Sequence, residues 1–150
     1  MAKTKYFVID PNGVKHTRST SRIYSHAVLY QNTKDDYLAT IPAWMETEKK
    51  NGKYYLDCIA NGYHKSLMRF PHYVDDKARQ AADVQEAIER LDGCTTPEEF
   101  AERLAERMRA KAEATDWNQW FCDGWCGRLD LAQKLAAKRG VSMIVAALTE

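Results

Sequence analysis

The chain has 150 residues, of which 45% are hydrophobic and 29% charged, and its formal net charge at pH 7 is +1. This size and composition are typical of one globular domain whose core needs no disulfide or metal. No apolar run approaches the about 20 residues that cross a bilayer, and the N-terminal residues contain no apolar signal region. We therefore expect a cytoplasmic protein with reduced thiols and no membrane partner.

The small net charge hides an asymmetry along the chain. Residues 1–75 contain 11 Lys and Arg against 7 Asp and Glu, a net charge of +4, whereas residues 76–150 contain 11 against 14, a net charge of −3. Within residues 3–34 the ratio is 6 to 1, with Asp10 as the only acid. A local basic field of this kind attracts anionic partners, and salt weakens it. The alternative is an ordinary solvated sheet face.

The chain begins with a predicted β-hairpin. Residues 5–10 are rich in β-forming side chains, and residues 10–13, Asp-Pro-Asn-Gly, form a turn sequence. In such a turn proline fixes φ, and Asn-Gly tolerates positive φ. Residues 14–20 then predict a second strand antiparallel to the first.

A third strand is predicted over residues 22–30, which are rich in β-branched and aromatic side chains. Alternation along a strand gives this segment two faces. One is an aromatic face, formed by Tyr24, His26, Val28 and Tyr30, which we expect another element to cover in part. The opposite face would contribute Ile23, Ala27 and Leu29 to the core.

The predicted β-rich region extends to residue 73. Residues 37–45 indicate a short strand or a connecting segment, because Pro42 favours an edge or a bend. A polar loop is expected over residues 46–53, with Asn51-Gly52 at its tip. Residues 53–60 then predict another strand, which ends at the turn sequence Asn61-Gly62.

From residue 75 to residue 140 the hydrophobic period becomes helical, with apolar residues three and four positions apart. The clearest helix start is Thr96-Pro97, where Thr96 is an N-cap candidate and Glu99 completes a capping box. Residues 141–148 are apolar and predict a final strand that returns to the sheet, with a helical continuation as the alternative. Together these segments predict a single α+β domain over residues 1–150. In it an N-terminal antiparallel sheet, a hairpin or meander, packs against about three C-terminal helices.

Two groups of side chains are candidates for partner binding. Basic and aromatic residues on and after the second strand suit phosphate oxygens, bases or an acidic protein surface. They are Lys15, His16, Arg18, Arg22, Tyr24 and His26. A second group, Trp117, Trp120 and Trp125, has the indole side chains that are enriched at interface hot spots, although such residues also serve as core anchors.

No catalytic motif stands out in the sequence. It contains no Gly-x-Ser-x-Gly elbow, no His-Glu-x-x-His and no glycine-rich phosphate loop. Cys122 and Cys126 would lie one turn apart on a helix and are weak candidates for a shared zinc ion, with buried thiols as the alternative. We therefore predict a non-enzymatic protein without a cofactor.

Two short segments resemble parts of small, mostly uncharacterised bacteriophage accessory proteins. Residues 18–28, Arg-Ser-Thr-Ser-Arg-Ile-Tyr-Ser-His-Ala-Val, are similar to an N-terminal strand segment of such proteins. Residues 125–132, Trp-Cys-Gly-Arg-Leu-Asp-Leu-Ala, are similar to a second segment that opens a helix near the C-terminus. Neither segment carries a catalytic role, and together they cover about 20 of the 150 residues.

The resemblance implies a protein that binds and disables host machinery. We hypothesise a phage-type binding protein that acts on a host protein or nucleoprotein complex, for example as an inhibitor of a defence system such as CRISPR, in the host cytoplasm. One alternative is a small nucleic-acid-binding protein that uses the basic N-terminal strands. Another is a zinc- or thiol-dependent function of Cys122 and Cys126. The sequence leaves the partner's identity and the oligomeric state open.

Overall fold

A computed structural model describes residues 2–150 and divides the chain into two compact units. Unit 1 combines the chain up to Asp36 with the segment Thr115–Glu150, and unit 2 comprises Tyr37–Ala114. The α+β class is as predicted. Instead of one sheet with helices packed on it, however, a helical unit is inserted into the sequence of a β-rich unit.

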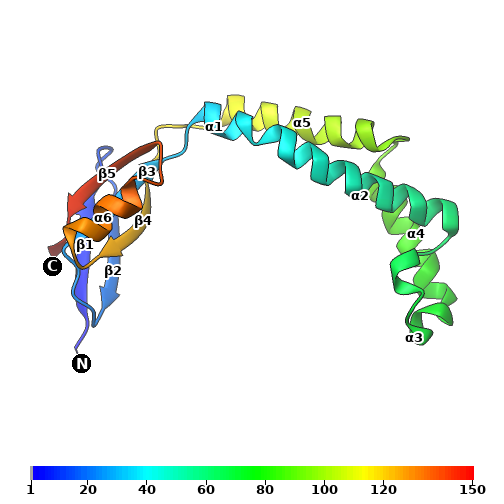
Figure 1. Ribbon diagram of the computed structural model, residues 1–150, viewed down its shortest axis with the longest axis horizontal. Coiled ribbons are helices and arrows are strands. Elements are labelled where there is room, and N and C mark those ends of the chain that lie inside the picture. Colours follow the sequence, from blue (N-terminus) through cyan, green and yellow to red (C-terminus); the bar gives the residue numbers. More distant parts are fainter. Residues whose placement is uncertain (1) are drawn as a thin grey trace. The chain divides into compact units, whose positions relative to one another are not determined.

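Unit 1 contains two small antiparallel sheets (Figure 1). The first has the strand order β2-β1-β6, with β1 at Thr4–Ile9, β2 at Lys15–Thr20 and β6 at Leu148–Thr149. The second has the order β4-β3-β5, with β3 at His26–Gln31, β4 at Phe121–Cys126 and β5 at Val141–Ala146. The predicted N-terminal hairpin is confirmed, and the C-terminal segment forms strands rather than a helix.

Strand β3 is the centre of unit 1, because both its faces are covered. Ala27 and Leu29 are fully buried and cluster with Val8 of the first sheet. Val28 is also fully buried, on the opposite face, where α6 (Leu129–Ala136) packs against β3. Its pairing partner on the neighbouring strand β4 is Gly124. A Cβ atom on Gly124 would lie 2.9 Å from Leu135 Cδ2, so glycine allows this helix to approach β4 closely.

Two details of the predicted third strand need correction. The strand begins at His26, and Ile23, expected in the core, lies before it and is 84% exposed. The reason is that only the segment paired with β4 and β5 is covered by neighbouring layers. The face that includes Val28 was expected to be covered in part by another element, and α6 does cover it at Val28.

Unit 2 is helical. The helix α1 (Lys34–Ala39) crosses the boundary between the units, and α2 (Ile41–Asn61) comes directly after it. The short helices η1 (Lys65–Leu67) and α3 (Pro71–Val74) lead to α4 (Lys77–Leu91) and α5 (Pro97–Ala114). Helix α2 packs along α5 and against α4 (Figure 1). Among the helices of residues 2–150, none combines the length and apolar character that crossing a membrane requires.

Several element boundaries predicted from the sequence are wrong. The expected β-rich region ends at Gln31 instead of residue 73, and the strand predicted over residues 53–60 lies within α2. Strand β4 also interrupts the segment predicted to be helical between residues 75 and 140. The start of α5 is confirmed, since Glu99 N–H donates to Thr96 Oγ1 at 3.1 Å.

Gly52 explains why the sequence indicates a loop where α2 is continuous. The Asn51-Gly52 pair is a turn signal, but Gly52 is buried in the middle of the helix. A Cβ atom there would lie 3.1 Å from Phe100 Cβ, so the missing side chain lets α5 approach α2. Tyr55, on the same helix, packs edge-on against Phe100 at 6.0 Å between ring centroids. Here glycine serves helix packing rather than a turn.

This contact predicts the effect of a bulky side chain at position 52. Gly52→Val places two methyl groups against Phe100 and should destabilise the protein by about 1–3 kcal/mol, the usual cost of overpacking. Urea denaturation followed by circular dichroism measures the change. Asn51→Val is the matched control, since Asn51 is the exposed neighbour on the same helix. Equal stability of the two variants would contradict the assigned contact.

Candidate functional site

Residues 18–28 and residues 125–132, the two segments singled out in the sequence, lie side by side in unit 1. Strands β3 and β4 pair so that His26 lies opposite Cys126 and Ala27 opposite Trp125. Just before β3, Ser25 N–H donates to the carbonyl oxygen of Cys126 at 2.9 Å. Residues 18–28 and 125–132 are separated by almost 100 positions in the sequence. The fold therefore joins them into one candidate site.

Arg18 and three aromatic rings form the centre of this site, here called the Arg18 stack. The Arg18 guanidinium lies 5.5 Å from the centroid of the Tyr24 ring, a cation–π distance. Tyr24 contacts Trp125 with 6.2 Å between ring centroids, and Tyr6 edge-on at 5.6 Å. Tyr6 is buried, Tyr24 and Trp125 are half-buried, and Arg18 is exposed. The stack thus joins the core of unit 1 to its surface.

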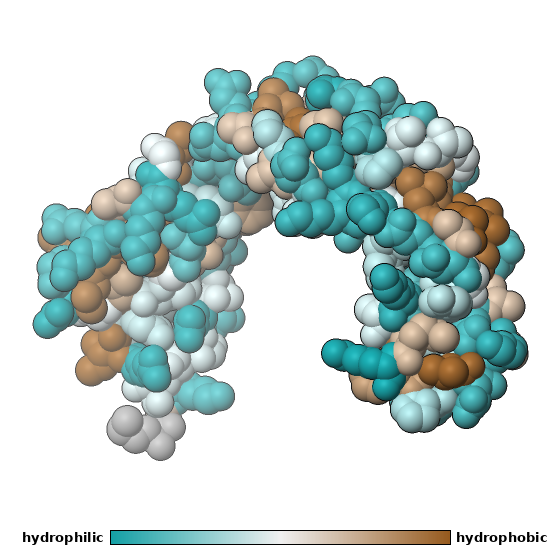
Figure 2. Space-filling view, turned by 45° about the vertical axis from the view of Figure 1, so that its right-hand side comes forward, coloured by the Kyte–Doolittle hydropathy of each residue, from teal (hydrophilic) through white to brown (hydrophobic). Residues whose placement is uncertain are grey.

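Beside the Arg18 stack lies a strongly exposed aliphatic side chain. Ile23 is 84% exposed and stands between Arg22 and Tyr24 in the connection from β2 to β3. Its carbonyl oxygen lies 3.2 Å from the position that a Cβ atom on Gly127 would take. The two connections, residues 21–24 and residues 127–128, are therefore adjacent, and together they form the tip of unit 1. In the view of Figure 2, hydrophobic side chains form small patches among hydrophilic ones.

The predicted basic cluster is divided by the pleat of β2. His16 and Arg18 lie opposite Val8 and Tyr6, so their side chains share the inward face. Lys15 lies on the outward face, where it forms an ion pair with Glu150. Hydrogen bonds from Lys15 and Lys5 lower the pKa of Glu150 below the ordinary carboxyl value. Lys15 is thus on a different face from Arg18, with its charge partly neutralised.

His16 is tied to the hairpin turn. Its Nε2 atom lies 2.8 Å from Asp10 Oδ2, while Asp10 Oδ1 accepts hydrogen bonds from the N–H groups of Asn12 and Val14. Burial alone would raise the pKa of Asp10, but the hydrogen bonds from His16 and the two backbone N–H groups outweigh it. The pKa of Asp10 is therefore lowered. The geometry assigns His16 a structural role at the turn.

The other predicted contact residues fall into different environments. Arg22 is exposed at the tip, and its backbone N–H donates to Thr20 Oγ1. His26 Nδ1 lies 2.8 Å from Ser25 Oγ, at the start of β3. Trp120 packs against the core of unit 1, and Trp117 is half-buried before β4. Of the three tryptophans predicted as contacts, only Trp125 belongs to the Arg18 stack.

Cys122 and Cys126 do not lie on a helix. Both belong to β4, where four residues span about 13 Å instead of about 6 Å on a helix. Both are free thiols, and burial raises the pKa of each. Within residues 2–150 no group of three or more His, Cys, Asp and Glu side chains is arranged to hold a metal ion. The helical spacing behind the zinc hypothesis is therefore wrong.

Sequence reasoning missed a buried polar network in unit 2. Tyr73 Oη donates to Asp83 Oδ2 at 2.9 Å and accepts from the backbone N–H of His64 at 3.0 Å. Asp83 also pairs with Arg79, four residues before it on α4, at 3.1 Å. The sequence contained one signal of this network: Arg79 and Asp83 are four residues apart, a spacing that places both side chains on one face of a helix. The network ties α3 and the preceding turn to α4.

Cys58 lies close to this network without the properties of a catalytic thiol. Its Sγ atom is 4.0 Å from His64 Nε2, and the side chain is 1% exposed. Burial and the charge of Asp83 raise the pKa of Cys58. A nucleophilic cysteine requires the opposite, a lowered pKa and access for substrate. Cys58 is therefore assigned to the packing of unit 2.

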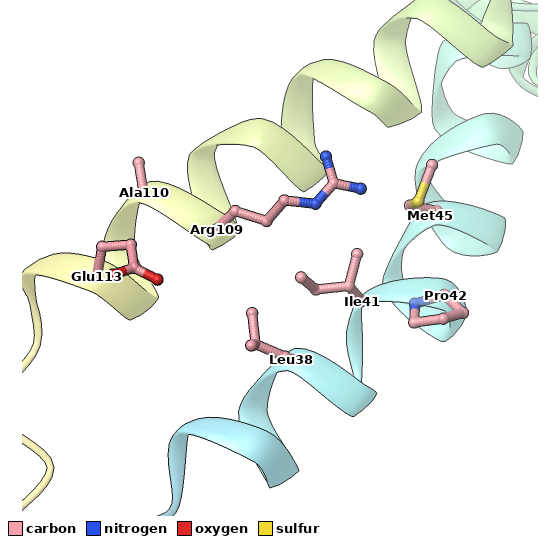
Figure 3. Close-up of a pocket in the computed structure, with 7 residues that line it drawn as sticks. All are labelled: Leu38, Ile41, Pro42, Met45, Arg109, Ala110 and Glu113. Atoms are coloured by element: carbon pink, nitrogen blue, oxygen red, sulfur yellow. The ribbon is translucent and has the colours of Figure 1, made fainter.

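A groove of about 600 Å³ lies at one end of unit 2 (Figure 3). Its floor is apolar, with the side chains of Leu38, Ile41 and Met45 on one side. Arg109 and Glu113 of α5 lie on the opposite side, and Arg109 forms an ion pair with Glu102 at 2.8 Å. The groove thus offers apolar contact and little polar chemistry that would select a ligand.

Comparison of the chain with protein-family models, curated proteins and solved structures finds no significant match.

The buried network predicts a loss of stability when its central hydroxyl is removed. Tyr73→Phe keeps the ring but leaves Asp83 and the His64 N–H without this partner. An unsatisfied buried group costs about 1–3 kcal/mol, and thermal denaturation should show a corresponding decrease in stability. Tyr63→Phe, a change of the same chemistry at a half-buried tyrosine, is the control. An unchanged Tm for Tyr73→Phe would show that the network is not formed.

The lowered pKa of Asp10 predicts that this residue contributes to the stability of unit 1 in a pH-dependent way. A carboxyl whose pKa is lowered in the folded state stabilises that state above its unfolded pKa, near 3.8. This stabilisation is lost as the pH falls through the lower, folded-state pKa. Asp10→Asn should therefore be less stable than the wild type at pH 7, with the difference vanishing in strong acid. Chemical denaturation at several pH values measures this, with Asp35→Asn as control; a difference independent of pH would contradict the assignment.

Proposed function

We propose that this protein is a non-enzymatic binding protein that docks on a protein partner through the tip and the Arg18 stack of unit 1. The observation that carries the proposal is the 84% exposed Ile23, which directly precedes Tyr24 of the Arg18 stack in the chain. Burying a large exposed aliphatic side chain against a partner removes it from water and stabilises the complex. Arginine, tyrosine and tryptophan are the residues most enriched at interface hot spots.

The rigidity of the site also supports binding. Tyr24 is fixed by contacts with both Tyr6 and Trp125, and its neighbour Ser25 is hydrogen bonded to β4. Side chains that are already ordered lose little conformational entropy when they bind. Ile23 therefore projects from a well-supported loop, which favours docking on a preformed partner surface.

Nucleic-acid binding is the second candidate function, and the charge distribution makes it less favourable. Among the basic candidates on and after β2, Lys15 is paired with Glu150, and His16 lies against Asp10. Arg18 and Arg22 have no acidic partner among residues 2–150, so two arginines are left for phosphate contacts. A sequence-independent nucleic-acid interface usually uses more cations than this. An exposed isoleucine fits an apolar protein surface better than a phosphate backbone.

The context of the proposal comes from the resemblance to bacteriophage accessory proteins. The two segments that carry it, residues 18–28 and 125–132, together supply most of the tip and the Arg18 stack. We propose that the partner is a host protein or nucleoprotein complex. Inhibition of a host defence system, CRISPR effectors included, is the biological role we suggest for such binding. Direct blocking of a partner surface fits the chain better than mimicry of DNA, because its net charge is close to zero.

The proposal predicts that a charge at the tip abolishes binding. Ile23→Asp introduces a carboxylate that an apolar interface must desolvate, and it should reduce partner retention by at least about tenfold. The measurement compares the proteins that immobilised wild type and variant retain from bacterial lysate, with and without nuclease treatment. Val14→Asp is the matched control, because Val14 is 54% exposed at the β1–β2 turn.

The same experiment separates the two candidate functions. A protein retained by the wild type and by Val14→Asp, but not by Ile23→Asp, supports docking through the tip. Retention that disappears with nuclease and falls steeply with salt supports nucleic-acid binding instead. Equal retention by all three proteins contradicts both proposals for this surface.

A further inference from the structure

Strand β2 has a free edge. It lies at the end of its sheet, and within the described residues it pairs with β1 alone. Asp10 N–H donates to the carbonyl oxygen of Val14, which fixes the alternation of hydrogen bonds along the hairpin. By that alternation, the backbone N–H and C=O groups of residues 16, 18 and 20 point toward β1. Those of Lys15, Thr17 and Ser19 point away from the sheet.

This edge is accessible and regular. Thr17, Arg18 and Ser19 are all exposed, and β2 pairs over six residues without a register shift. The edge strand β4, by contrast, contains a bulge at Asp123, which interrupts its backbone pattern. Strand β5, the other edge of the second sheet, runs directly into β6, which pairs with β1. Of the sheet edges in the described part of the chain, that of β2 is best suited to strand addition.

We propose that β2 binds an extended acidic peptide segment of the partner, which adds to the sheet as a strand beside Lys15–Thr20. This inference rests on the proposed protein-binding function and states which kind of partner segment the surface takes. Main-chain hydrogen bonds from Lys15, Thr17 and Ser19 would hold such a segment. Acidic side chains on the inward face would meet Arg18, whereas Lys15 on the outward face is already paired with Glu150.

Charge selects this occupant over a second copy of the chain. Pairing β2 with another β2 would set one basic strand beside another, with no acidic side chain among residues 15–20 to offset the positive charges, and like charges across a strand pair are destabilising. Arg18 and Arg22 have no acidic partner within residues 2–150. Strand β2 also leads directly into residues 21–24, so a segment bound along it extends to the tip. The strand edge and the tip thus form one continuous surface.

Amide hydrogen exchange in the full chain tests the proposal without any substitution. The probe is a six-residue peptide of alternating glutamate and valine, which combines negative charge with a preference for extended structure. We expect it to slow exchange at Lys15, Thr17 and Ser19 at least about fivefold, the effect of one protecting hydrogen bond each. A peptide of alternating lysine and valine should leave these amides unchanged. Unchanged exchange with the acidic peptide, or equal protection by both peptides, would overturn the proposal.

A pair of variants provides an independent test. Thr17→Pro removes an N–H that points away from β1, so it deletes one bond to the peptide and none to the sheet. Binding of the acidic peptide, followed by fluorescence anisotropy, should weaken about tenfold in Thr17→Pro and less than about twofold in Thr17→Ala. Equal affinity of the two variants would mean that the peptide binds by charge alone and would overturn the strand model. If Thr17→Pro does not fold, the exchange measurement decides.

The two proposals can fail separately. A lysate partner that is lost with Ile23→Asp but kept by folded Thr17→Pro leaves the proposed function standing and overturns strand addition. A partner lost with both variants, and kept with Thr17→Ala, supports both. Loss with Thr17→Pro alone supports strand addition and removes the tip from the proposed interface.

Discussion

The antiparallel pairing of β3 with β4 and β5 is the interaction on which unit 1 depends. It brings together segments from the two ends of the chain, and it buries Ala27, Val28 and Leu29 completely. Because β3 is covered on both faces, its side chains contribute more buried apolar area than a strand with one wet face could. The same pairing places Tyr24 against Trp125, so the candidate site is a direct consequence of how the core closes.

Unit 2 is stabilised differently, by close helix packing in place of strand pairing. Gly52 lets α5 approach α2, and Tyr73 links the backbone of His64 to the carboxylate of Asp83. The two hydrogen bonds of Tyr73 satisfy buried polar groups that would otherwise destabilise a small helical unit. The two units therefore differ in what they present. Unit 1 has charged and aromatic side chains at its tip. Unit 2 has an interior of ordinary helix contacts and an apolar groove at one end.

Ion pairs within the molecule reduce the positive charge that the N-terminal segment offers to a partner. Glu150 pairs with Lys5 and Lys15, and Asp10 with His16, so part of the charge in residues 3–18 is balanced locally. Arg18 and Arg22, near Ile23 in the sequence, have no acidic partner within residues 2–150. A compact basic and apolar surface favours a protein partner with acidic and apolar side chains over a uniform polyanion.

The sequence by itself determined the local features: the α+β class, the hairpin at residues 5–20 and the capped start of α5 at Thr96. It favoured a strand over residues 141–148 and left a helix there as the alternative. Each depends on turn residues, caps or alternation within a few positions. Only the tertiary structure decided that residues 41–61 form one helix, because Gly52 is explained by Phe100, nearly 50 residues away. It also decided which predicted contacts lie together: the pleat of β2 separates Lys15 from Arg18, and strand pairing joins Tyr24 to Trp125. Such contacts are made between residues far apart in sequence, where periodicity and turn signals carry no information.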